Sequence, residues 1–347
     1  MKFRTIYIYL AFAAVIISTA TGCKKWLDIP ADVDYFSEKV DYTTKTFSPV
    51  LGRTTVITNI FNYDNSSLPL TFQLLNVRKA DGTPADNLTK VQPVWVWSTA
   101  YDGKETSLQQ ILDKRKKEDH PLWELRKSGD LILWQSATNA SVPAYQGSTN
   151  PGGYLFDVKV SNSGGEKTIK DLLLNPLREM PYEPTNMDVI SSLPKDSILP
   201  SELSGMIGQN TRKALSNDNK DVYIYFKRTG NGNSLTFKFL DKNKNPMNVD
   251  AFKDTKWAGL IHGFNMQKTG DYVRYDVAYP IPLVKLPTKY TNGDGSRAMV
   301  EFSYTRIGFN GIRETGKLKF NFSIFREGDW EIDFHFRNDT PRFQDEY

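Results

Sequence analysis

The sequence contains very few of the residues that form covalent crosslinks or metal sites. Its 347 residues include one cysteine and three histidines. A single cysteine excludes an intramolecular disulfide, so the fold must be stabilised by buried apolar groups, and a chain of this length can supply one or two cores. The histidines, His120, His262 and His335, lie far apart in the sequence, and none has a His or Cys neighbour at ligand spacing. We therefore expect no metal and no other cofactor, and we expect His335, on the polar face of a strand, to be exposed.

The chain also lacks a strong charge of one sign and a long hydrophobic run. Its net charge is +4, and it falls to +2 if residues 1–22, which contain Lys2 and Arg4, are removed. Such a balance argues against a nucleic-acid partner. The apolar run at 6–17 is too short to span a bilayer, which needs about 20 residues. No Gly-x-Ser-x-Gly elbow, which would indicate a nucleophilic serine, occurs in the sequence. Glycoside hydrolysis needs a pair of carboxylates, but with 40 acidic residues some pair is inevitable, so their number does not indicate catalytic residues.

The N-terminus has the pattern of a bacterial export signal. Two basic residues precede the apolar run, and small residues at 18–22 lead directly to Cys23. This arrangement resembles the lipobox of bacterial lipoproteins, in which the cysteine is acylated and becomes the new N-terminus. The resemblance implies a signal peptide over 1–22, a lipid on Cys23 that anchors the protein to a membrane, and a tether over 23–42. Lys24, in place of an aspartate, points to the outer membrane, at its surface or its periplasmic face.

Beyond the tether, alternation of apolar and polar residues predicts a mainly β protein. We expect two β-sandwich-like domains, immunoglobulin-like or jelly-roll-like: an N-terminal β-rich domain over 43–185 and a C-terminal antiparallel sandwich over 216–347. A Pro- and Ser-rich segment over 186–215 reads as a linker. A helix capped by Thr106, with 113–117 as its solvated face, and a second short helix near 168–174 interrupt the first domain. Expected strands cover 54–61, 70–77, 91–98, 131–135, 154–160, 222–228, 234–240, 272–279, 298–308, 312–325 and 330–336. The string at 229–233 (TGNGN), between two of these strands, predicts a hairpin turn.

Aromatic residues of the first domain are the candidate ligand-binding residues. Trp95 and Trp97 are two positions apart, so a strand places both on one face and Val94 and Val96 on the other. Planar rings can stack on the apolar faces of sugars, but tryptophans also dominate sandwich cores. The sequence leaves both interpretations open, core or binding platform, for the full candidate set: Trp95, Trp97, Tyr101 and Trp134.

Several strings resemble a known family. The start of the tether, 23–28 (CKKWLD), is similar to outer-membrane lipoproteins of the Bacteroidetes. An uncharacterised lipoprotein family of that phylum, domain of unknown function 5007, resembles the chain at 76–82 (NVRKADG), 93–97 (PVWVW), 153–158 (GYLFDV) and 176–184 (PLREMPYEP). The resemblance implies a companion of nutrient or polysaccharide uptake systems. We expect a non-enzymatic protein that binds a glycan or an outer-membrane uptake protein; the alternatives are a surface hydrolase acting on a polysaccharide and a structural component of a surface assembly.

Overall fold

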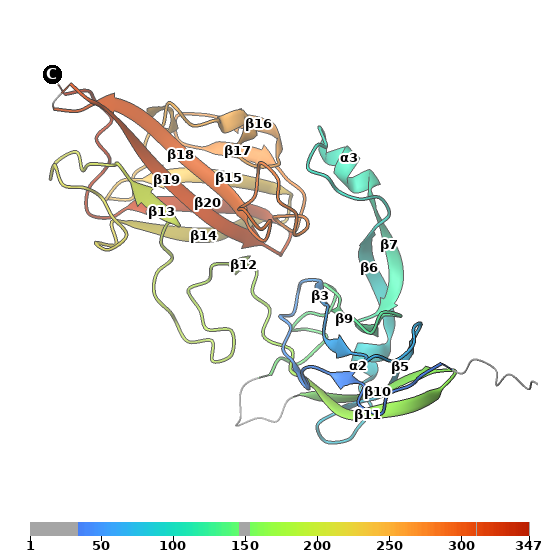
Figure 1. Ribbon diagram of the computed structural model, residues 1–347. Helices are drawn as coiled ribbons and strands as arrows, with labels where there is room; N and C mark the ends of the chain where they lie inside the picture. Colours follow the sequence, from blue (N-terminus) through green and yellow to red (C-terminus); the bar gives the residue numbers. More distant parts are fainter. Residues whose placement is uncertain (1–33, 146–152, 310, 347) are drawn as a thin grey trace, which may run out of the picture.

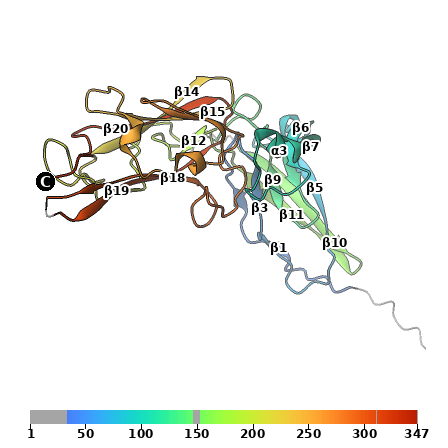
Figure 2. The ribbon, with the colours of Figure 1, turned by 90° about the horizontal axis from the view of Figure 1, so that it is seen from above.

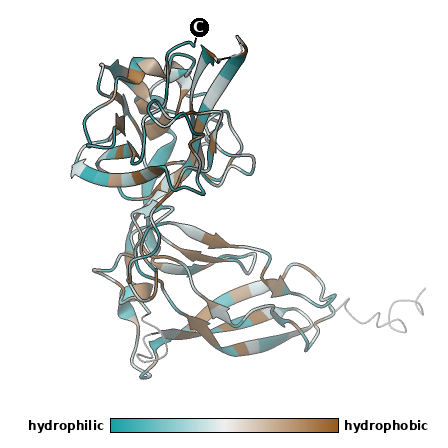
Figure 3. Ribbon diagram, turned by 90° about the vertical axis from the view of Figure 1, so that its left-hand side faces the viewer, coloured by the Kyte–Doolittle hydropathy of each residue, from teal (hydrophilic) through white to brown (hydrophobic). Residues whose placement is uncertain are grey.

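The computed structural model describes residues 34–145, 153–309 and 311–346. Within them the chain is mainly β, as predicted, and its strands form several sheets around two large apolar cores. Figure 1 shows the two strand-rich bodies, and in Figure 3 apolar segments recur along the strands of each. Cys23 and the predicted signal peptide lie outside the described residues. No helix within the described part of the chain is both long enough and apolar enough to cross a membrane.

The C-terminal domain is a two-layer sandwich (Figure 2). The alternating apolar residues of 318–324 and 330–336 all face its core, as the pattern predicts, but they belong to opposite layers. Two short 3₁₀ turns, η1 (Val249–Ala251) and η2 (Trp257–Gly259), contribute Val249 and Trp257 to the same core. One layer has the order β14 (Val222–Gly230), β20 (Asp329–Phe336), β15 (Ser234–Leu240), β17 (Val273–Asp276) and β16 (Phe264–Lys268). The other comprises β12 (Tyr182–Glu183), β19 (Arg313–Ile324) and β13 (Glu202–Ser204), with β18 (Ala298–Ile307) paired to β19.

Two sequence expectations for this domain are wrong. The turn at 229–233 does not close a hairpin, because β20 lies between β14 and β15 and pairs in parallel with β15. The Asp329 carboxylate accepts hydrogen bonds from the Gly232 amide and the Ser234 hydroxyl, which holds the connection across the end of β20. His335 is buried, only 7% exposed, because Tyr223 and Leu240 flank it in the neighbouring strands.

The N-terminal domain surrounds a core in which Trp123 and Phe156 meet edge to face, with ring centroids 5.5 Å apart. Residues 168–174, expected to form a helix, are part of a strand. The four-stranded sheet has the order β2 (Thr46–Phe47), β11 (Gly165–Leu174), β10 (Tyr154–Asn162) and β5 (Thr71–Lys79). A three-stranded sheet has the order β3 (Thr55–Ile57), β9 (Leu131–Leu133) and β8 (Trp123–Leu125). A two-stranded sheet pairs β1 (Asp41–Tyr42) with β4 (Phe61–Asn62). The domain also contains a short helix, α2 (Asp86–Thr89).

A projecting arm, residues 91–121, extends from the N-terminal domain to the side of the C-terminal domain (Figure 1). It consists of β6 (Val91–Trp97), α3 (Leu108–Asp113) and β7 (Arg115–Pro121), with β6 and β7 paired antiparallel. The cap of α3 is Ser107, one residue after the expected Thr106, and its hydroxyl accepts a hydrogen bond from the Gln110 amide. The helix ends at Asp113, so the charged residues 115–117 lie on a strand and are not its solvated face.

The segment 186–215 runs along the C-terminal domain. Its strand β13 pairs with β19, and it contributes Ile198, Met206 and Leu215 to the C-terminal core. Apolar burial of this kind ties a segment to the domain whose core it enters. The positions of the domain boundaries along the chain stay predictions.

Candidate functional site

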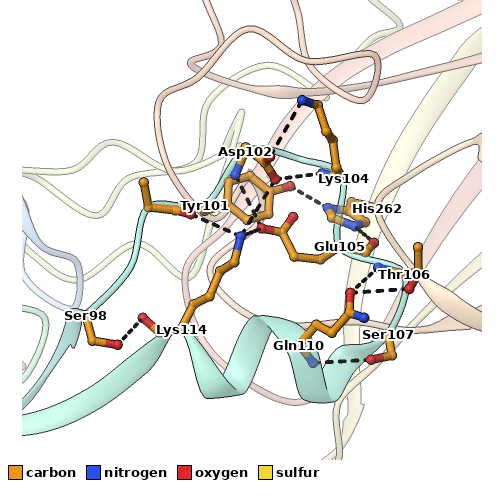
Figure 4. A network of polar contacts seen from close by, with 11 residues as sticks. Ser98, Tyr101, Asp102, Lys104, Glu105, Thr106, Ser107, Gln110, Lys114 and His262 are labelled. Carbon is orange, nitrogen blue, oxygen red and sulfur yellow. Dashed lines mark hydrogen bonds and ion pairs between the residues drawn. The ribbon is translucent and has the colours of Figure 1, made fainter.

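The tip of the arm is fixed to the C-terminal domain by a polar network (Figure 4). His262 lies between two arm residues: its Nε2 is 2.8 Å from the Glu105 carbonyl oxygen and its Nδ1 is 2.5 Å from the Tyr101 hydroxyl. A carbonyl can only accept, so Nε2 donates to Glu105, and Nδ1 pairs with the Tyr101 hydroxyl. The His262 ring also stacks on Tyr290, with centroids 4.8 Å apart. Burial raises the pKa of Tyr101, which keeps its hydroxyl protonated as a donor.

The same network holds the arm's own loop in shape. Lys114, which follows α3, reaches back to Glu105 at 2.5 Å, to Asp102 at 3.7 Å and to the Ala100 carbonyl at 3.1 Å. Burial raises the pKa of the Glu105 carboxyl, but the Lys114 ammonium and backbone amides outweigh burial and leave the pKa below its usual value. Glu105 is therefore an ionised carboxylate that is only 6% exposed. Such a charge is tolerated because it is paired.

Behind this network, apolar and cationic groups complete the contact between the domains. Trp97 packs in a small cluster with Ile111 of α3 and with Ala278 and Leu283 of the C-terminal domain. Arg115, opposite Trp97 in the β6–β7 register, donates from Nη1 to the Tyr279 carbonyl oxygen at 2.7 Å. These contacts place the face of the arm that carries Trp97 against the loop after β17.

A cleft of about 950 Å³ opens where the arm faces the C-terminal domain. We call it the interdomain cleft. One wall is formed by the arm and the β8–β9 region, the other by the loop 279–285 and residues near the end of β19. Its volume lies within the range of about 300–1,000 Å³ that is typical of small-molecule sites. Trp95, Trp97 and Trp134 all line it.

The four predicted aromatic residues occupy different environments. Trp95 is 39% exposed, and Trp97 is half-buried at the domain contact. Trp134 is only 6% exposed, packs with Val94 and Ile132, and donates its indole N–H to the Glu124 carboxylate at 2.7 Å. Tyr101 lies at the tip of the arm and lines a separate cavity of about 30 Å³. The structure thus brings together three of the four, and a ligand-binding role for each stays a prediction.

Sequence reasoning missed the charged residues of the cleft. Arg115 lies over the rings of Trp95 and Trp97, with its guanidinium carbon 5.6 and 5.4 Å from their centroids. Burial lowers the pKa of Arg115, an effect that Glu327 of the opposite wall opposes. The sequence does contain a signal for Arg115. An aromatic string that ends at Trp97 and a charged string that contains Arg115 lie on either side of one helix. The signal does not identify Arg115 as a cleft residue, because the pattern places 113–117 on the solvated face of that helix.

A histidine with two carboxylates forms a second polar group in the cleft. His120 Nδ1 is 2.8 Å from Glu124 and its Nε2 is 3.3 Å from Glu118. Burial lowers the pKa of His120, but hydrogen bonds to Glu118 and Glu124 outweigh burial and raise the pKa overall. Hydrogen bonds from Lys116 and from His120 lower the pKa of Glu118. Within the described ranges, no group of three His, Cys, Asp or Glu side chains is placed to hold a metal ion.

Comparison with known proteins identifies the family of the chain. No curated protein matches the chain. The model of a family described as a domain of unknown function, DUF5007, matches residues 61–345, which include the whole arm and all of the cleft lining except its residues within 52–56. That match extends over most of the sequence, and the chain belongs to the DUF5007 family.

Proposed function

We propose that this protein is a lipid-anchored outer-membrane lipoprotein that binds a glycan in the interdomain cleft as a non-enzymatic accessory of polysaccharide uptake. The export signal that ends at Cys23 supports the anchor. The observation that carries the binding proposal is Trp95, a large aromatic ring that is 39% exposed on the wall of a cleft of about 950 Å³.

The surroundings of Trp95 favour a polar, ring-shaped ligand. Thr54, Ser98 and Gln135 line the same cleft and provide hydroxyl and amide groups. A glycan presents apolar ring faces, which stack on aromatic side chains, and hydroxyls, which pair with such polar groups. Thr54 already donates to Gln135, and Ser98 to the Lys114 carbonyl, but each hydroxyl oxygen can still accept a hydrogen bond from a sugar hydroxyl.

The cleft also contains carboxylates, so hydrolysis is the alternative that an experiment must separate. Glycoside hydrolysis requires one carboxylic acid with a raised pKa to protonate the leaving group. Lys116 and His120 lower the pKa of Glu118, and Glu124 is hydrogen-bonded to His120 and Trp134. The lowered pKa of Glu118 keeps this carboxylate ionised and makes it unsuited to be that acid, which supports binding over hydrolysis.

The experiment is a glycan array probed with the full chain in detergent, followed by titration of each hit. Trp95→Ala should weaken binding by about tenfold or more, because truncation of a tryptophan that anchors a partner often costs about 2 kcal/mol or more. Tyr225→Ala is the matched control: Tyr225 is 40% exposed, yet lies on β14, away from the cleft. Release of new reducing ends would favour the hydrolase. Self-association without any glycan binding would favour the structural component.

A further inference from the structure

The interdomain cleft carries an excess of positive charge. Its lining includes five Arg or Lys side chains and three carboxylates. Two of these cations are neutralised: Arg53 pairs with Glu183 at 2.7 Å, and Lys116 pairs with Glu118 at 2.7 Å. The other three have no carboxylate oxygen within 4.0 Å among the residues that the structure describes: Arg115, Arg126 and Lys285. Cationic groups that line a concave site concentrate the field and attract anions.

Arg115 is the best placed of these cations to bind an anion. Its Nη1 donates to the Tyr279 carbonyl, while its Nε is buried without a hydrogen-bond partner in the described chain. The guanidinium also lies over the Trp95 and Trp97 rings, which fixes its plane in the cleft. A fixed guanidinium suits the planar fork of a carboxylate or the oxygens of a sulfate.

Lys285 supplies a cation from the opposite wall. It is exposed in the loop after the two cis-proline peptides and forms no ion pair within the described residues. Arg115 belongs to the arm and Lys285 to the C-terminal domain, so a ligand that reaches both side chains contacts both walls. Among the described residues, Glu327 is the one carboxylate of the cleft with no Lys, Arg or His nitrogen within 4.0 Å, and Glu124 has only His120. The three unpaired cations outnumber these two carboxylates.

From these contacts we propose that the ligand of the interdomain cleft is an acidic glycan. Its carboxylate or sulfate group binds Arg115 and Lys285, and a neighbouring sugar ring packs on Trp95. This inference rests on the proposed glycan-binding function and adds the charge class of the ligand and the two cationic residues that select it.

The test titrates the full chain in detergent with three hexasaccharide probes: an oligogalacturonate, a chondroitin sulfate and a neutral cello-oligosaccharide. We expect at least one acidic probe to bind about tenfold more tightly than the neutral one, equivalent to about 1.4 kcal/mol. The difference should shrink at high salt, which screens exposed charges. A preference for the uronate or for the sulfate identifies the acidic group. Equal affinity for neutral and acidic probes overturns the inference and leaves glycan binding intact; no binding to any probe or to the wider array overturns both proposals.

Charge variants then locate the site. Lys285→Gln should weaken binding of the acidic probe by about three- to tenfold and leave binding of the neutral probe unchanged. Because Lys285 is exposed, the substitution should not disturb folding, so a loss of binding would not be explained by misfolding. Arg115→Lys keeps the charge but removes the planar fork, and should weaken the carboxylate probe by a similar factor. Arg313→Gln, an exposed arginine on β19 outside the cleft, is the control. Unchanged acidic binding in both cleft variants, or binding that survives Trp95→Ala in full, contradicts the proposal.

Discussion

Trp95 and Trp97 are only two positions apart, and the structure predicts opposite consequences for their loss. Trp97 is half-buried against Ile111, Ala278 and Leu283. Complete burial of a Trp or Phe makes its replacement by Ala cost about 3–5 kcal/mol, so the half-buried Trp97→Ala should cost about 2 kcal/mol. Trp95→Ala, at an exposed position, should cost less than about 1 kcal/mol.

Chemical denaturation of the two variants, followed by circular dichroism, measures these losses. Because Trp97 bridges the arm and the C-terminal domain, its loss should also make the transition less cooperative. A double-mutant cycle with Leu283→Ala sharpens the test, since Leu283 belongs to the same cluster. We expect a coupling of about 0.5 kcal/mol or more for Trp97 with Leu283, and none for Trp95 with Leu283. A larger loss of stability for Trp95→Ala than for Trp97→Ala would refute the assignment of Trp97 to the domain contact.

Three further predictions concern other parts of the chain. Cys23→Ala should abolish labelling by radioactive palmitate and leave the precursor unprocessed; normal processing and membrane retention would contradict the anchor. His120→Gln should destabilise the protein below about pH 6.5 and have little effect well above that pH. The reason is that the pKa of His120 is raised in the folded state, so its stabilising contribution is lost as the pH rises through that folded-state pKa. A difference in denaturation midpoint that does not depend on pH would refute the pairing of His120 with Glu118 and Glu124. Lys114→Met should cost about 1–3 kcal/mol at pH 7, because it leaves Glu105 buried and charged, with Lys104→Met as the exposed control.

The strands were predictable where one face is buried and the backbone is regular, and the expected helix at 168–174 shows where this fails. Ile169 and Leu172 are both buried and three positions apart, a spacing that resembles a helix. The structure explains the spacing by a bulge: the register shifts between Phe156 and Val158, and Asp171 has a φ of 58°. An extra residue in a strand returns the next side chain to the same face. A bulge in a strand and a single turn of helix therefore both place buried residues three positions apart, and the sequence pattern alone does not distinguish them.

Strand partners were less predictable than strands. The alternation in 222–228 and 234–240 identifies two strands around a turn, and a local hairpin is the simplest connection. The insertion of β20 between them depends on residues about one hundred positions away, such as Asp329, which binds the turn. Alternation specifies which face is buried but not which strand is the neighbour.

The candidate site was only partly predictable for the same reason. The strings around Trp95 and Trp97 indicated an aromatic face, and β6 provides it. The opposite wall, with Tyr279 and Lys285, comes from a segment more than 150 residues away and has no motif of its own. Contacts between such distant segments are decided by tertiary packing, which leaves no fixed spacing in the sequence.

The position of Arg115 links binding to the relation between the two domains. Its Nη1 bonds the Tyr279 carbonyl of one domain, while its backbone belongs to the arm of the other. A ligand that binds Arg115 and Lys285 therefore contacts both domains at once and favours the arrangement in which the cleft is closed. By linkage, anything that loosens the network of Tyr101, Glu105 and His262 lowers the fraction of molecules with a complete cleft, and weakens binding without touching the ligand. For the proposed glycan site, contacts of the arm that lie outside the cleft would therefore contribute to binding.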